Sequence, residues 1–151
     1  MATTAKINIR PAHSDDLADI VAINQAGQES VWSERQFASA LNGNGTLWVL
    51  TQNDQVAAFL LWHSVLDEAE IHHFGVATTA LRRGLASQLL SQLITHCRSV
   101  GIHRIILDVR AGNQAAKALY LKHGFVVNGQ RTGYYQTATG REDALLMEKT
   151  C

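Results

Sequence analysis

Apolar residues recur along the chain with two periods, and the changes of period divide it into strands and helices. Ile7–Arg10 alternates between apolar and polar residues, which predicts a first strand. Ser14 precedes an apolar period that runs to Gly27, and this predicts a helix with Ser14 as its N-cap. A second, shorter helix is predicted between Ser33, its N-cap, and Asn42.

The middle of the chain carries apolar segments that predict consecutive strands. The first two are Thr46–Gln52 and Val56–Val65, joined by the turn signal Asn53–Asp54, and the third is Glu70–Val76. A fourth apolar run, His103–Val109, lies between two helical segments. We therefore expect it to pair in parallel with the strand Glu70–Val76.

A long helix is predicted between these last two strands. Its apolar stripe extends over about four turns and consists of Leu85, Leu89, Leu93 and Cys97. A further helix is predicted from Asn113, its N-cap, to the C-cap signal Gly124. The segments Phe125–Val127 and Ala144–Met147 predict a final strand pair around a glycine- and tyrosine-rich loop. The order β-α-α-β-β-β-α-β-α-β-β indicates an α/β (α+β) fold with a mixed sheet, and we expect residues 1–151 to form a single domain.

Composition narrows the class of protein without indicating a reaction. The 151 residues are 46% hydrophobic and carry no net charge, so nothing calls for nucleic acid or an anionic membrane as partner. The longest apolar runs are far shorter than a membrane span, and Cys97 and Cys151 do not suggest a disulfide framework. His72 and His73 have no nearby cysteine or aspartate cluster at ligand spacing, so no metal site is expected. We expect a cytoplasmic monomer.

The segment that leads into the long helix is a candidate binding site for phosphate. It consists of Leu81, Arg82, Arg83, Gly84, Leu85 and Ala86. The first N–H groups of a helix have no partner within it, and the helix dipole places partial positive charge there. A glycine lets the backbone approach a ligand closely, and two arginines add formal charge. These features favour a pyrophosphate, although the same spacing also fits an ordinary helix start with solvated arginines.

This segment and the order of elements resemble the GNAT superfamily of acetyl-CoA-dependent N-acetyltransferases. Further stretches resemble its RimI branch, which acetylates the N-terminal alanine of a small-subunit ribosomal protein. They are Val31–Glu34, Leu66–Ala69, Leu107–Asn113, Ala118–Tyr120, Gly124–Phe125, Tyr134–Tyr135 and Gly140–Ala144. The likeness extends from Ile7 to Lys149, and the last two stretches are its most specific part.

The resemblance implies acetyl-CoA as cosubstrate and central parallel strands that splay apart to receive it. The pantetheine arm would pair with the backbone groups of Phe74, Gly75 and Val76. The pyrophosphate would lie on the segment from Leu81 to Ala86, and the Asn113 side chain would contact coenzyme A besides capping a helix. Leu81 departs from the family, which has glutamine or arginine there, whereas Ala86 fits the pattern.

Two residues are implied as acid and base. Tyr120 lies where the family places a tyrosine that protonates the coenzyme A sulfur, although its position also suits a core tyrosine. Asp108 lies where the RimI branch has a glutamate base, and its side chain is shorter by about 1.5 Å, which favours relay through a water. Glu70 and His73, or its neighbour His72, remain alternative bases.

The acceptor groove is implied to lie between a loop with Trp32 and a loop with Tyr134 and Tyr135, while Trp32 alone also reads as a core residue. Val31 and Gln136 stand where the RimI branch has prolines, which removes backbone restraint from both loops. We predict acetyl transfer to the N-terminal alanine of a ribosomal protein, since an α-amine of pKa about 8 suits a single weak base. Two alternatives remain: a GNAT enzyme for another amine, and a non-catalytic acyl-CoA-binding module.

Overall fold

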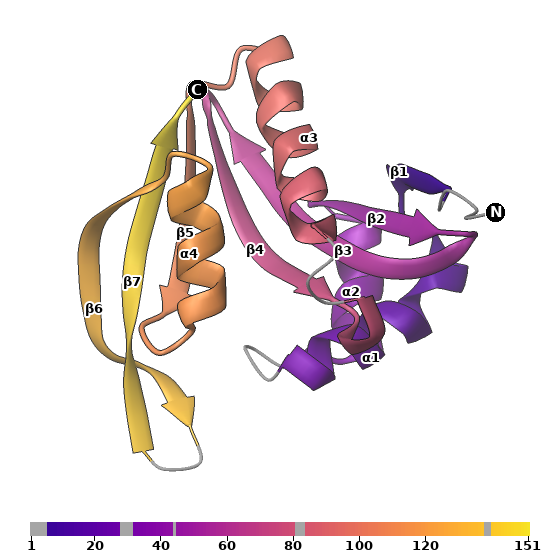
Figure 1. Cartoon of the computed structure of the whole chain (residues 1–151), viewed down its shortest axis with the longest axis horizontal. Helices are drawn as coiled ribbons and strands as arrows, with labels where there is room; N and C mark the ends of the chain where they lie inside the picture. The colour runs from indigo at the N-terminus through magenta and orange to yellow at the C-terminus, as the bar shows by residue number, and fades with distance from the viewer. Residues whose placement is uncertain (1–5, 28–31, 44, 81–83, 138–139) are drawn as a thin grey trace, which may run out of the picture. The chain divides into compact units, whose positions relative to one another are not determined.

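A computed structural model of the chain describes residues 6–27, 32–43, 45–80, 84–137 and 140–151 (Figure 1). The elements are β1 Ile7–Pro11, η1 Ser14–Asp16, α1 Leu17–Gly27, α2 Glu34–Leu41, β2 Thr46–Gln52, β3 Gln55–Val65, β4 Glu68–Val76, η2 Thr78–Ala80, α3 Leu85–Ser99, β5 Arg104–Arg110, α4 Gln114–Lys122, β6 Val126–Thr137 and β7 Gly140–Thr150. The two η elements are single 3₁₀ turns. The predicted order of helices and strands is confirmed.

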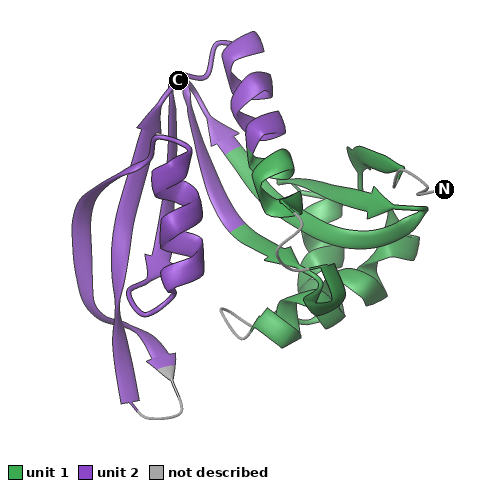
Figure 2. Cartoon of the chain, viewed as in Figure 1, with its two compact units in different colours: residues 1–63, 73–90 green, residues 64–72, 91–151 purple. Residues whose placement is uncertain are grey.

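The chain divides into two compact units (Figure 2). Unit 1 is Met1–His63 with His73–Leu90, and unit 2 is Ser64–His72 with Ser91–Cys151. The strand order is β1-β2-β3-β4 in unit 1 and β4-β5-β7-β6 in unit 2, with β4 common to both. This is the mixed sheet that the sequence predicted, whereas the single domain stays a prediction.

Unit 1 is built on antiparallel strands and two helices. Its core forms where α1 and α2 bury their apolar residues against β2 and β3, and it contains Leu17, Ile20, Ile23, Phe37, Leu47, Val49, Phe59 and Leu61. Ser33 caps α2 as predicted, because its hydroxyl accepts a hydrogen bond from the Gln36 N–H at 3.2 Å.

The N-cap predicted at Ser14 is wrong by one residue. The helical turn begins at Ser14, and its N-cap is His13. The His13 N–H donates to the Asp16 carboxylate at 2.9 Å, and Arg10 forms a salt bridge with the same carboxylate at 2.8 Å. The buried acid at the third position of the turn thus accepts a hydrogen bond from the N–H of the N-cap residue, which is the N3 half of a capping box.

Unit 2 contains the predicted parallel pairing. β4 pairs with β5 in a parallel register of four pairs, from Glu68–Arg104 to Ile71–Leu107. β4 continues to Val76 beyond the last of these pairs, which is where the resemblance implies that the strands splay. β5, β7 and β6 then pair antiparallel. The stripe predicted on α3 is confirmed, since Leu85, Leu89, Leu93 and Cys97 are all buried.

The final strand pair is much longer than predicted. β6 and β7 form a long hairpin (Figure 1), and Tyr134 and Tyr135 lie within β6 instead of in a loop. The prediction failed because β6 does not keep a strict period of two: its register with β7 shifts between Val127 and Gly129 and again between Arg131 and Tyr135. Each bulge interrupts the alternation by which a strand is recognised in sequence.

No helix among the described residues is both long and apolar enough to cross a membrane.

Candidate active site

One face of the sheet in unit 2 is half exposed and carries charged side chains. On β5 every second residue is buried, and Asp108 belongs to the half-exposed set. Paired residues of neighbouring strands point to the same face of a sheet. The register places Glu70 of β4 opposite Ile106, so Glu70 and Asp108 share this face. His72 lies two residues beyond Glu70 and is exposed on the same side.

The Asp108 carboxyl is an acid on this face whose pKa is shifted by its surroundings. Burial raises its pKa above the ordinary aspartate value, because the charged form loses hydration. Arg131 and His72 oppose this effect and lower the pKa, whereas the neighbouring Glu70 carboxylate raises it further. A carboxylate with a raised pKa is a stronger base than a solvated one, which suits proton abstraction.

Arg131 interacts electrostatically with the Asp108 carboxylate and also lies over the Tyr134 ring. This residue was not identified from the sequence. The register aligns Arg110 with Ala144 and Ala144 with Arg131, which places Arg131 on the same face as Asp108. Its guanidinium lies 5.1 Å from the centroid of the Tyr134 ring, within range of a cation–π interaction. The position could be found in sequence only by knowing the bulged register of β6.

Of the two tyrosines predicted to contact the acceptor, Tyr134 is exposed and Tyr135 is half buried. Tyr134 is 50% exposed, and its ring meets that of Tyr135 edge-on with centroids 5.1 Å apart. Tyr135 pairs with Glu142 of β7. A half-exposed aromatic ring beside a cation is a suitable contact for a peptide acceptor.

Tyr120, the predicted acid, lies on α4 of unit 2. It is 6% exposed, and its ring packs against Phe125 with centroids 5.4 Å apart. Asn113 is the N-cap of the same helix, as predicted, because its side-chain oxygen accepts a hydrogen bond from the Ala116 N–H at 3.1 Å. Unit 2 thus contains both proposed catalytic residues, the tyrosine pair and Asn113.

Trp32 and His73 lie in unit 1 and are in contact. Their ring centroids are 4.2 Å apart, and both rings pack against Phe37. The backbone N–H of Trp32 donates to Oδ1 of the buried Asn24 side chain at 2.9 Å. His73 is only 8% exposed, and strand alternation directs it away from the face that carries Glu70. This environment supports a structural role for His73. The predicted groove between Trp32 and the tyrosine pair stays a prediction.

The predicted cofactor residues of unit 1 lie on β4 and at the start of α3. Phe74, Gly75 and Val76 are half buried at the end of β4. A Cβ on Gly75 would come within 2.8 Å of the Phe59 ring, so this glycine lets β4 lie close to the core. Leu81, Arg82 and Arg83 lie outside the described residues.

Gly84 immediately precedes α3 with a φ of +74°, a conformation that favours glycine. Among the described residues, no atom would lie within 4 Å of a Cβ at Gly84. The Gly84 carbonyl accepts the Gln88 N–H at 3.1 Å to begin the helix. Leu85 and Ala86, the next two predicted contacts, form the first turn of α3. This open space lies beside the N-terminus of α3, and the N-terminus of a helix favours a phosphate ligand.

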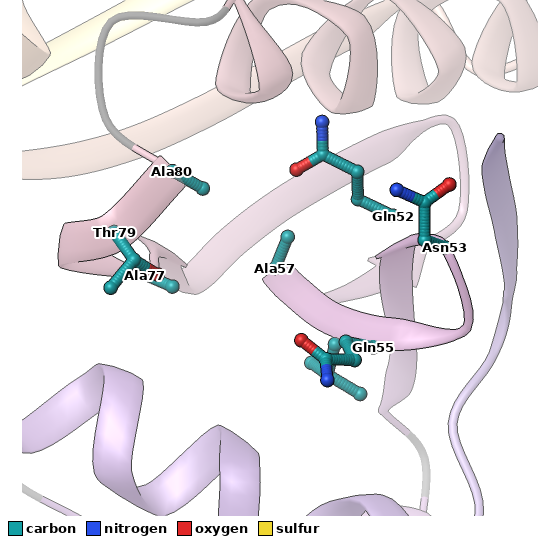
Figure 3. Close-up of a pocket in the computed structure, with 8 residues that line it drawn as sticks. Gln52, Asn53, Gln55, Ala57, Ala77, Thr79 and Ala80 are labelled. Atoms are coloured by element: carbon teal, nitrogen blue, oxygen red, sulfur yellow. The ribbon is translucent and has the colours of Figure 1, made fainter. Parts of the chain in front are cut away.

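A cavity of about 500 Å³ lies in unit 1 beside the residues that lead into α3 (Figure 3). It is lined by Gln52, Asn53, Gln55, Val56, Ala57, Ala77, Thr79 and Ala80. Its polar groups are mainly side-chain amides, and its lining includes none of the predicted site residues that the structure describes. Sequence reasoning recognised Asn53 and Asp54 as a turn, and both have positive φ, but gave no sign of a cavity there.

Comparison with known proteins gives relatives over nearly the whole chain. Residues 14–125 match the Acetyltransferase (GNAT) family. The ribosomal protein bS18-alanine N-acetyltransferase of Escherichia coli (strain K12) is 39% identical over 139 residues, which cover 92% of this chain and 94% of that protein. The protein of the same name from Haemophilus ducreyi is 32% identical over 87% of this chain and 92% of its own length.

Solved structures agree with these relatives. The crystal structure of the ribosomal-protein-S18-alanine N-acetyltransferase from Escherichia coli superposes with a TM-score of 0.88 at 37% identity. The match covers 96% of this chain and 94% of that one. Ard1 from Thermoplasma volcanium has the same fold, with a TM-score of 0.86 at 23% identity.

Proposed function

The chain belongs to the GNAT family of N-acetyltransferases, and from this premise we propose that it acetylates the N-terminal alanine of a small-subunit ribosomal protein. Acetyl-CoA, the cosubstrate of the family, supplies the acetyl group as a reactive thioester. The proposed acceptor is an α-amine with a pKa of about 8, which a single base of modest strength can deprotonate.

Asp108 acts in this proposal as the general base. Its short side chain takes the proton of the α-amine through a water, and the raised pKa of its carboxyl strengthens it for this step. Tyr120 acts as the general acid and delivers a proton to the departing thiolate. Tyr134 and Tyr135 bind the peptide acceptor. Trp32, a residue of unit 1, is also assigned to binding of the acceptor.

On the cofactor side, Phe74, Gly75 and Val76 offer backbone groups to an arm that carries amides. The segment from Leu81 to Ala86 receives the pyrophosphate, and Asn113 contacts coenzyme A from the start of α4. We place the reaction in the cytoplasm, where ribosomal proteins are made.

The observation that supports this proposal best is the arrangement on the half-exposed face of unit 2. A half-buried carboxylate with a raised pKa lies near Arg131, and that arginine lies over the ring of an exposed tyrosine. A base, a cation and an aromatic contact on one face can deprotonate a peptide amine and hold the residues that follow it.

The test is to incubate the protein with acetyl-CoA and a panel of acceptors and to measure the release of free thiol. We expect turnover with an alanine-initiated ribosomal peptide. The same peptide with a blocked α-amine serves as control and should give none. Turnover with small amines alone would favour a GNAT enzyme of another substrate. Binding of acetyl-CoA without turnover of any acceptor would favour a non-catalytic module.

We expect Gly84→Ala to weaken acetyl-CoA binding about tenfold, a loss of about 1.4 kcal/mol. The new methyl group would enter the open space beside the α3 N-terminus, where we place the pyrophosphate. Isothermal titration calorimetry measures the affinity. Gly101→Ala is the matched control, because Gly101 also has a positive φ (+81°) and open space around its Cβ, but follows α3 instead of preceding it.

Both variants should lose similar stability from the left-handed backbone, about 1–2 kcal/mol each. Equal affinities in the two variants would show that the pyrophosphate does not lie against Gly84.

A further inference from the structure

Two consecutive acidic residues of β7, Glu142 and Asp143, have no role in the function proposed above, yet each holds a different loop of unit 2. We propose that Asp143 is a positioning residue for the acceptor and Glu142 a positioning residue for acetyl-CoA. These two adjacent residues would then set the geometry of both the acceptor site and the acetyl-CoA site. The inference rests on the proposed function, because that function assigns the acceptor to Tyr134 and the cofactor to the start of α4.

Asp143 faces the wide bulge of β6. Arg131 pairs with Ala144 and Tyr135 pairs with Glu142, so the β6 residues between these two pairs face Asp143 alone. The ladder of backbone hydrogen bonds is broken there, and N–H groups in a bulge need another acceptor. A carboxylate side chain can replace the missing backbone carbonyl.

The contacts of Asp143 show that it takes this role. Its Oδ1 accepts a hydrogen bond from the Gly133 N–H at 2.8 Å, and its Oδ2 accepts one from Gln130 Nε2 at 2.5 Å. Gly133 has a φ of +63°, which the bulge requires. Arg141 Nη1 donates to the Gly133 carbonyl at 3.5 Å. Gly133 is thus held at both ends by β7.

Tyr134 directly follows this fixed glycine. The bulge leaves its ring 50% exposed, and Arg131 covers one ring face. Loss of the Asp143 carboxylate would release the Gly133 N–H and let the bulge rearrange, so the ring would no longer be held toward the acceptor. The effect should therefore fall on the peptide.

Glu142 holds the turn between β5 and α4. Its Oε1 accepts a hydrogen bond from the Gly112 N–H, and its Oε2 lies 3.5 Å from Arg110 Nε. The backbone carbonyl of Asp143 also accepts the Ala111 N–H at 2.9 Å. A Cβ on Gly112 would collide with the Glu142 carboxylate, so a larger residue there would displace this carboxylate.

Gly112 directly precedes Asn113, the N-cap of α4 and a proposed contact to coenzyme A. The same helix carries Tyr120. A shift of the Gly112 turn would therefore move the cap and the helix that follows it. The effect should fall on acetyl-CoA and leave the acceptor affinity unchanged.

Steady-state kinetics on the full chain, with the alanine-initiated peptide and acetyl-CoA varied in turn, tests this division. We expect Asp143→Ala to raise the KM for the peptide about tenfold, as loss of a hydrogen bond to a charged group implies, with the KM for acetyl-CoA unchanged. Asp143→Asn keeps an oxygen acceptor for the Gly133 N–H and should recover most of the peptide affinity.

Glu142→Ala should give the opposite pattern, with a KM for acetyl-CoA raised about tenfold and an unchanged KM for the peptide. Gly112→Ala should reproduce it, because the added methyl displaces the Glu142 carboxylate while that residue is kept. Glu142→Gln retains an acceptor oxygen and is the rescue variant.

A purely structural role would lower thermal stability and change both KM values together in each variant, and that result would overturn the inference. Amide hydrogen exchange gives a measurement independent of turnover. Exchange should quicken at residues 132–134 in Asp143→Ala and at residues 111–113 in Glu142→Ala, and unchanged exchange would also overturn it.

Failure of the proposed function looks different. In that case the wild type does not acetylate the alanine-initiated peptide at all. The variants are then compared on the amine that the wild type does acetylate, and on acetyl-CoA affinity by calorimetry. If Asp143→Ala then weakens only the binding of that amine and Glu142→Ala weakens only the binding of acetyl-CoA, the positioning roles hold although the proposed acceptor was wrong.

Discussion

Asp108→Asn is expected to lower kcat for an α-amine acceptor by about 100- to 10,000-fold, the usual contribution of a general base. Asparagine has nearly the same shape but cannot accept a proton at neutral pH. The KM for acetyl-CoA should stay unchanged, because the residue acts on the acceptor. Glu70→Gln is the matched control on the same face, opposite Ile106. Full activity in Asp108→Asn together with none in Glu70→Gln would move the base to Glu70.

The pH dependence of kcat tests the same assignment. The base works only when it is deprotonated, so activity should rise with pH along an acidic limb that lies above the ordinary aspartate pKa. Arg131 lowers the pKa of Asp108, so Arg131→Gln should move this limb to higher pH. A limb that does not move would indicate that another group titrates.

Stability should change in the direction opposite to activity. Burial raises the pKa of Asp108 in the folded protein above its value in the unfolded chain. Its contribution to stability is therefore fully present below the unfolded-state pKa and is lost as the pH rises through the folded-state pKa. Asp108→Asn avoids this loss and should unfold at a higher temperature than the wild type at neutral pH. The difference should vanish in acid, where both states of the wild type are protonated.

Tyr120→Phe is expected to lower kcat by about 100-fold or more while acetyl-CoA binds as tightly as in the wild type. Phenylalanine keeps the buried ring that packs against Phe125, so the fold should be retained. Tyr120→Ala would be a poor test, because removing a buried aromatic ring costs about 3–5 kcal/mol of stability. Calorimetry with acetyl-CoA and steady-state kinetics provide the two measurements.

A second cosubstrate can distinguish whether Tyr120 acts as a general acid or only orients the thioester. An acetyl thioester of a more acidic thiol needs less help to depart, so the defect of Tyr120→Phe should shrink with it. An equal defect with both thioesters would argue against proton donation. An unimpaired kcat would return Tyr120 to the role of a core residue.

Local patterns in the sequence were enough to predict most elements. The stripe on α3, the caps Ser33 and Asn113, and the turn at Asn53–Asp54 were all found where the residues indicated. Such features depend on neighbours within about one helical turn or one hairpin. They can therefore be recognised from residues that are close together in the sequence. The family resemblance was confirmed by relatives over nearly the whole chain.

The length of β6 and β7 could not be found in this way. The bulge at residues 132–134 breaks the alternation, and there the Gly133 N–H donates a hydrogen bond to Asp143 on another strand. A contact of this kind depends on strand register, which no local pattern encodes. The sequence therefore indicated a loop where the chain forms a strand.

By itself the sequence determined the order of elements, the family and the identity of the carboxylate and tyrosine proposed for catalysis. Only the tertiary structure decided which charges surround that carboxylate: Glu70 and His72 from β4 and Arg131 from β6. It also separated His72 from its neighbour, since His73 is buried against Trp32. The physical reason is that hydration and Coulomb interactions depend on distances across the sheet, and these are set when distant strands pair.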